Sequence, residues 1–87
     1  MTYELIVPPS IQRQIAGFPV GDQAELIAFF DRLPDECEQI TEPRGLEVPD
    51  SPVRMRIKGL SRLVVTVLIN DTTITVTVVE ITEPHGD

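Results

Sequence analysis

The fold is decided by one stretch of sequence, which reads VRMRIKGLSRLVVTVLINDTTITVTVVEI from Val53 to Ile81. Apolar residues alternate first with basic residues and then with threonine, and the pattern is interrupted around Gly59 and again around Asn70. Alternation with a period of two is typical of half-buried strands, and the interruptions mark turns. The sequence therefore predicts three consecutive antiparallel strands.

The first half of this stretch also holds most of the positive charge. Four of the seven basic residues of the chain lie there, namely Arg54, Arg56, Lys58 and Arg62, against fourteen acidic residues in the whole chain and a net charge of −7. An acidic chain is a poor general binder of nucleic acid or anionic membranes, because phosphate binding needs a positive surface. Any anion site is therefore expected in this stretch.

The length of the first hairpin loop decides which side chains share a sheet face. A three-residue loop, Gly59 to Ser61, would pair Lys58 with Arg62 and Ile57 with Leu63. The helix-covered face would then carry Val53, Met55, Ile57, Leu63, Val65, Val67, Ile69, Ile74, Val76 and Val78. The opposite face would carry Arg54, Arg56, Lys58, Arg62, Val64, Thr66, Leu68, Thr75, Thr77 and Val79. A two-residue loop would instead move Arg62 to the other face.

Two interpretations of the basic face stay open. The cations either extend into water or pair with the acidic residues of the 35–50 loop, or they form an anion site that faces an RNA phosphate or an acidic partner peptide. Like charges directly opposite one another in a sheet destabilise it by up to about 1 kcal/mol, so each interpretation has to relieve this repulsion.

The remaining chain predicts a single α+β domain over residues 1–87. A strand over 3–7 precedes a short helix that starts at Pro8–Ser10 and ends at Gly17, which is expected in the C′ role. A second helix over 23–33 has Asp22 as N-cap and Glu25 in a capping box, and Pro34 is expected to end it or restart a short turn. An acidic loop over 35–52 follows. The order is β-α-α-β-β-β, with two helices on one face of an antiparallel sheet.

Few residues outside the basic stretch could form a disulfide, bind a metal or act as a nucleophile. Cys37 is the single cysteine, which rules out an intrachain disulfide, and with only His85 beside it we expect no zinc site and no cofactor. No apolar run reaches the ~18 residues of a membrane span, so we expect a cytoplasmic protein. There is no glycine-rich phosphate loop and no nucleophile motif.

The order and spacing of four segments resemble the RelE/ParE toxin superfamily of bacterial toxin–antitoxin systems. These segments are Arg44-Gly45-Leu46, Val53-Arg54-Met55-Arg56-Ile57, Ser61-Arg62-Leu63-Val64-Val65 and the strand from Ile74 to Ile81. The resemblance covers nearly the whole chain and implies a RelE-like fold with an antitoxin-like protein as partner.

For activity, the resemblance implies a metal-free endoribonuclease that cleaves mRNA on the ribosome. Arg62 matches the strand arginine of the family and would stabilise the transition state. Arg54, Arg56, Lys58 and Arg44 would contact phosphate or a partner. Glu83 stands where the family keeps a basic residue.

That departure keeps alternatives open. The chain could resemble the gyrase-inhibiting branch, or it could be a non-catalytic RelE-fold module that binds an antitoxin-like protein, another partner or a second copy of itself as a homodimer.

Overall fold

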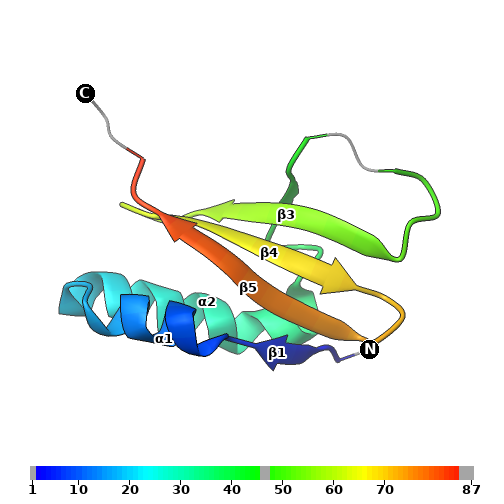
Figure 1. The fold of residues 1–87 in the computed structure, drawn as a ribbon. Helices are drawn as coiled ribbons and strands as arrows, with labels where there is room; N and C mark the ends of the chain where they lie inside the picture. The colour runs from blue at the N-terminus through cyan, green and yellow to red at the C-terminus, as the bar shows by residue number, and fades with distance from the viewer. Residues whose placement is uncertain (1, 46–47, 85–87) are drawn as a thin grey trace.

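The computed structural model describes residues 2–45 and 48–84. The described elements are β1 (Glu4–Ile6), α1 (Pro9–Ala16), α2 (Val20–Glu36), β2 (Glu42–Pro43), β3 (Val53–Gly59), β4 (Val64–Asn70) and β5 (Thr75–Thr82). Figure 1 shows two layers, with both helices on one side of a sheet whose strand order is β1-β5-β4-β3-β2. The predicted α+β class, the two helices and the three-strand meander are confirmed.

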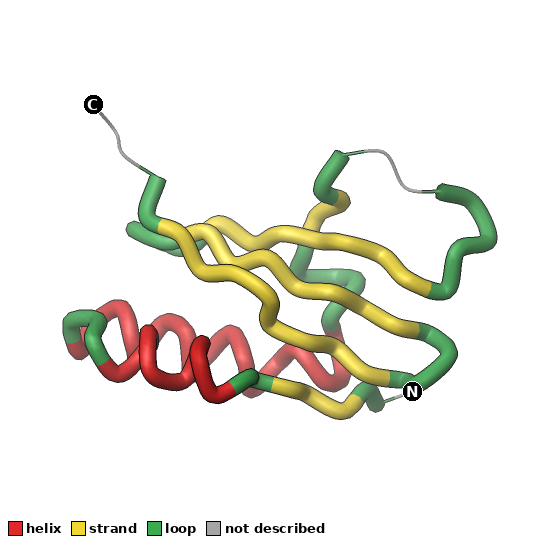
Figure 2. The backbone as a smooth tube through the Cα atoms, in the orientation of Figure 1, coloured by secondary structure: helices red, strands yellow, loops and turns green. Residues whose placement is uncertain are grey.

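The sheet differs from the prediction in two ways. β1 pairs with β5 in parallel, so the sheet is mixed rather than wholly antiparallel. The two-residue strand β2 pairs with β3 inside the segment that the sequence assigned to a loop. Figure 2 shows how this short strand places the 37–43 segment along the edge of β3. A two-residue strand that contains a proline has too short a pattern for its sequence to reveal.

The helices start and end differently from the sequence prediction. Asp22 is not an N-cap, because α2 begins at Val20 after Pro19 and Asp22 lies buried in the first turn. The predicted capping box does not form, since the Glu25 carboxylate accepts hydrogen bonds from Ser61 instead. Pro34 does not end α2, which continues to Glu36. Gly17 does end α1, but with a φ of −88°, so no left-handed conformation is needed there.

The core lies between the helices and the two central strands. It is built from apolar side chains that the sequence placed on the helix-covered face of β4 and β5, and this part of the register prediction is confirmed. The buried apolar residues are Ile11, Leu26, Phe29, Leu33, Cys37, Leu63, Val65, Val67, Ile69, Val76, Val78 and Ile81. A register shift at Val79 lets Ile81 return to the core side of β5.

The register of β3 is the main correction. The Leu60 N–H donates to the Leu63 carbonyl at 2.8 Å, so only Ser61 and Arg62 form the tip of the hairpin. Lys58 therefore pairs with Val65 and Arg56 with Val67, instead of the pairing that a three-residue loop would give. Side chains on paired residues share a face. The cations of β3 consequently face the helix side with the core valines, while Val53, Met55 and Ile57 face the other way.

Arg56 joins β3 to the segment that follows α2. Its side chain is buried and donates to the Thr41 hydroxyl at 2.8 Å, to the Thr41 carbonyl at 2.6 Å and to the Glu38 carbonyl at 3.1 Å. The Thr41 hydroxyl in turn bonds the Cys37 carbonyl. A planar guanidinium can bond several acceptors from one position, so Arg56 fixes the path of residues 37–43.

Replacing Arg56 tests this role. We expect Arg56→Met to lower the free energy of unfolding by about 2–4 kcal/mol, because buried acceptors lose their donor. Arg56→Lys should recover only part of that loss, since one ammonium cannot reproduce the fork. Urea unfolding followed by circular dichroism measures both values. Arg13→Met, at an exposed cation of α1, is the control and should change stability by less than about 0.5 kcal/mol. Equal stabilities of Arg56→Met and the control would contradict the assignment.

Candidate functional site

Arg54 does not form an open anion site. Its guanidinium Nη2 lies 3.3 Å from a Glu38 carboxylate oxygen and 3.1 Å from an Asp71 carboxylate oxygen, and its side chain is only 17% exposed. The hydrogen bond to Glu38 and the charges of Glu38 and Asp71 raise the pKa of Arg54 further above its usual range. Two carboxylates thus neutralise this cation within the fold.

Tyr3 joins the same cluster. Its hydroxyl donates to the Asp71 oxygen that Arg54 also contacts, at 2.6 Å. This hydrogen bond, together with burial and the Asp71 charge, raises the pKa of Tyr3 to about 12. The cluster ties the start of the chain to the β4–β5 turn and to β3, which is a structural role.

Arg62 occupies the tip of the β3–β4 hairpin. Its side chain is 62% exposed, with Nε 3.8 Å from an Asp22 oxygen and Nη2 3.9 Å from a Glu83 oxygen. These distances are long for hydrogen bonds, so the pairs are loose surface contacts. Arg62 lies at the hairpin tip, whereas Arg54 and Arg56 lie within β3 and contact the segment that follows α2. The structure therefore does not gather the predicted cations into one cluster.

Lys58 differs from its neighbours on β3. It is half-buried on the helix side, and its ammonium group makes no ion pair or hydrogen bond within the part of the chain that the structure describes. It lines two adjoining cavities beside α2. Among the β3 cations, Lys58 therefore keeps a charge that is not neutralised within 4 Å.

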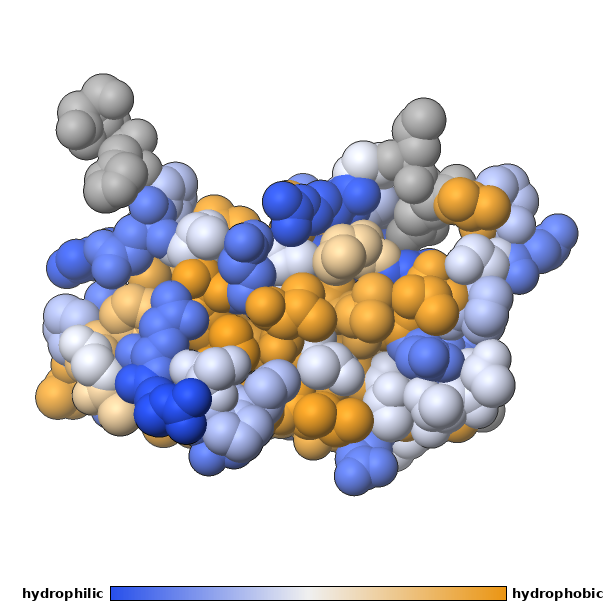
Figure 3. Space-filling view, in the orientation of Figure 1, coloured by the Kyte–Doolittle hydropathy of each residue, from blue (hydrophilic) through white to orange (hydrophobic). Residues whose placement is uncertain are grey.

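The sheet face opposite the helices, here called the helix-free face, is largely apolar. Ile6, Val53, Met55 and Val79 are exposed on it, between 37% and 41%. Half-buried apolar side chains share this face, namely Ile57 of β3 and Val64 and Leu68 of β4. Figure 3 shows hydrophobic side chains in a band across the middle of the molecule, over the strands. Sequence reasoning missed this surface because it assigned the apolar side chains of β3 to the core.

Arg44 is the cation that reaches this face. Its backbone N–H donates to the Met55 carbonyl, and its guanidinium lies 3.3 Å from the Thr66 hydroxyl and 3.4 Å from a Glu80 oxygen. Thr66 and Glu80 are paired residues of β4 and β5. Arg44 thus extends from the edge of the sheet across to β5, next to exposed apolar side chains.

Residues 2–45 and 48–84 hold no group of three or more metal-ligating side chains, and no helix there is long and apolar enough to cross a membrane. Cys37 is buried, and burial raises the pKa of its thiol. Leu46 and His85, which the sequence analysis named, lie outside the described residues.

The fold has clear counterparts among solved structures. The RelE–RelB complex of the archaeon Pyrococcus horikoshii contains a chain that matches with a TM-score of 0.80 and 17% identity, over 99% of this chain and 98% of that one. The RelBE2 toxin–antitoxin complex of Mycobacterium tuberculosis gives a TM-score of 0.72 and 16% identity, over 97% of this chain and 93% of that one.

The chain has the RelE fold. Its sequence matches no protein-family model and no curated protein. The structural agreement spans nearly all of both chains, so the predicted RelE-like architecture is confirmed. The roles predicted for Arg62, Arg44 and the β3 cations are not decided by likeness of fold, and they stay predictions whose geometry is described above.

Tyr3 gives a direct test of the acidic cluster, because it is the only tyrosine of the chain and there is no tryptophan. We expect its absorbance to titrate with a pKa of about 12 in the folded protein. A folded pKa above the unfolded value of about 10 stabilises the fold below pH 10, and that contribution is lost as pH rises toward 12.

The control is Asp71→Asn, which removes the negative charge and should return the tyrosine pKa toward about 10. In Tyr3→Phe the loss of stability between pH 10 and 12 should become shallower. A titration near pH 10 in the folded wild-type protein would contradict the Tyr3–Asp71 hydrogen bond.

Proposed function

We propose that this protein is the RelE-like member of a toxin–antitoxin pair, and that an antitoxin-like protein docks on its helix-free face. The observation that carries the proposal is the group of exposed apolar residues on that face, Ile6, Val53, Met55 and Val79. Contiguous exposed apolar surface on a small protein is typical of a surface that another protein covers. Support also comes from the two similar structures, one a RelE–RelB complex and the other the RelBE2 toxin–antitoxin complex.

The charges on this face favour protein over nucleic acid. Glu4, Glu42 and Glu80 share it with Arg44, so negative side chains outnumber the positive one among the described residues. A phosphate backbone would meet repulsion there, since nucleic-acid binding depends on several positive contacts. A peptide that presents apolar side chains carries no row of phosphates, so it avoids this repulsion and can cover the exposed apolar residues.

Two substitutions in the apolar surface test this docking. The protein would be co-expressed with the product of a small reading frame beside its gene, and affinity measured by calorimetry on the purified pair. Met55→Asp combined with Val79→Asp should raise Kd by roughly a hundredfold or more, because each change places a charge in an apolar contact. Both positions are exposed in the free protein, so folding should survive.

The matched control is Ile27→Asp, which adds the same charge at a 57% exposed apolar residue of α2. We expect it to change Kd by about twofold at most. Equal weakening by the control would mean that added negative charge, rather than the helix-free face, governs binding. Unchanged affinity of the double variant would place the partner elsewhere.

A second candidate function is cleavage of mRNA on the ribosome, with Arg62 as the group that stabilises charge on the phosphate. The supporting observation is the exposed guanidinium of Arg62 at the hairpin tip. In this chemistry a ribose 2′-hydroxyl attacks the adjacent phosphate, and a cation stabilises the added negative charge. The outward side chains of β3 are Val53, Met55 and Ile57, which offer no donor to a phosphate, and this ranks the candidate second.

Induced expression in bacteria separates the two functions. Cleavage predicts growth arrest with fragmented mRNA in ribosome-bound transcripts, and Arg62→Ala should relieve both. A protein that only binds its partner should leave growth unchanged, both as the wild type and as Arg62→Ala. Arg13→Ala serves as the control for loss of a surface cation, and growth arrest that persists in Arg62→Ala would exclude the role assigned to Arg62.

A further inference from the structure

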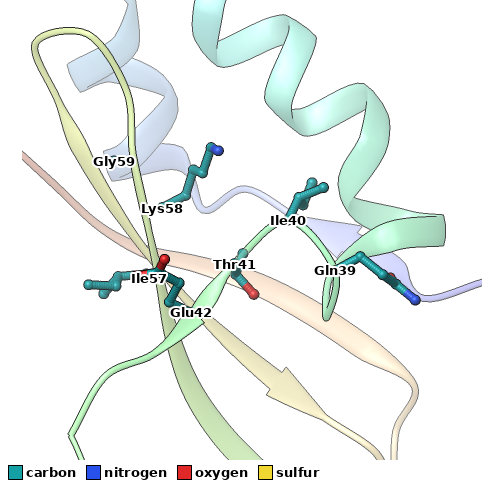
Figure 4. Close-up of a pocket in the computed structure, with 7 residues that line it drawn as sticks. All are labelled: Gln39, Ile40, Thr41, Glu42, Ile57, Lys58 and Gly59. Atoms are coloured by element: carbon teal, nitrogen blue, oxygen red, sulfur yellow. The ribbon is translucent and has the colours of Figure 1, made fainter.

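A groove runs from the edge of β3 beside residues 39–42 to the space between α2 and the end of β3. One cavity of about 400 Å³ lies between residues 39–42 and 57–59. A second of about 200 Å³ lies between α2 and Leu60. Lys58 and Ile40 line both, so the two cavities adjoin. Figure 4 shows the Lys58 and Ile40 side chains pointing to the same side of β3, toward α2, while Ile57 points away.

The polar lining of the groove is matched to a single negative charge. Lys58 is its cation without an ion pair, whereas Arg32 at the far wall is held by Glu36 at 3.0 Å. Glu42 lines the first cavity and Glu25 the second. A doubly charged phosphate near Lys58 would be repelled by both glutamates. A single carboxylate is attracted by Lys58 in the same way but is repelled less, because it carries half the charge.

The remaining lining suits the rest of a peptide. Ala28, Phe29 and Leu60 give the second cavity an apolar wall. In the first cavity, the β2–β3 ladder reaches only the pair Glu42–Ile57, so the backbone edge of Gly59 has no strand beside it in the described chain. Exposed strand edges accept main-chain hydrogen bonds from extended peptides.

We propose that this groove binds an extended segment of a partner protein that presents one carboxylate to Lys58 and one apolar side chain to the wall formed by Ala28, Phe29 and Leu60. In an extended segment, residues two apart lie on the same face. The segment therefore needs an acidic and an apolar residue separated by one position. Lys58 and the apolar wall lie on the helix side of the sheet, whereas Glu42 and Ile57 of the first cavity belong to the helix-free face. The proposal does not depend on the function proposed for that face.

Two blocked tripeptides test the proposal, acetyl-Leu-Ser-Glu-amide and acetyl-Leu-Ser-Gln-amide. They would be titrated into the intact protein labelled with ¹⁵N, and amide shifts followed by NMR. We expect the Glu peptide to shift the amides of Ile40, Lys58 and Gly59 and to bind about threefold or more tighter than the Gln peptide, as a partly exposed ion pair allows. Lys58→Met should remove this difference, and Arg13→Met should keep it.

Two further measurements complete the test. Ala28→Phe fills the apolar part of the groove at an exposed helix position and should weaken both peptides, while amide dispersion reports that the variant is folded. Inorganic phosphate should leave the groove amides unshifted. The proposal is overturned if the Glu and Gln peptides bind equally, or if phosphate shifts the groove amides through Lys58 and the peptides do not.

Discussion

The hydrogen bond from the Leu60 N–H to the Leu63 carbonyl closes the β3–β4 hairpin with two residues at its tip, and the arrangement of charge follows from it. Because side chains alternate along a strand, a change of one residue in loop length exchanges the two faces of β3. The tip is held against α2, since the Glu25 carboxylate accepts the Ser61 N–H and hydroxyl. With this register, the cations of β3 face the acidic segment that follows α2.

The acidic segment that follows α2 explains why cations can lie on the helix-covered side of the sheet. The end of α2 and the residues after it supply the Glu38 carboxylate and backbone carbonyls directly over β3. A buried arginine is costly without partners and tolerated when its donors are satisfied. Arg56 and Arg54 find acceptors there, and their apolar neighbours Met55 and Ile57 are left on the opposite face. The register of β3 therefore has two consequences. Arg54 and Arg56 find partners on the helix side, and the helix-free face is apolar.

This arrangement changes how the RelE fold should be understood in this chain. The positive stretch that stood out in the sequence is mostly used to attach the 37–43 segment to the sheet. The helix-free face is largely apolar, with Arg44 beside it, and Lys58 keeps its charge in a groove at the edge of β3. The proposed binding of protein segments rests on these features, whereas phosphate chemistry would rest on Arg62 at the hairpin tip.

The sequence by itself determined the α+β class, the helices, the meander and the core faces of β4 and β5, because period-two and helical patterns depend on local burial. It also indicated the RelE-like architecture. Only the tertiary structure decided the face of β3, the parallel pairing of β1 and the short strand β2. The alternation in β3 fits either face equally well, with apolar residues on one side and cations on the other. The acceptors that make the cationic side suitable for the interior come from residues 38–41, which are distant in sequence and close only in the fold.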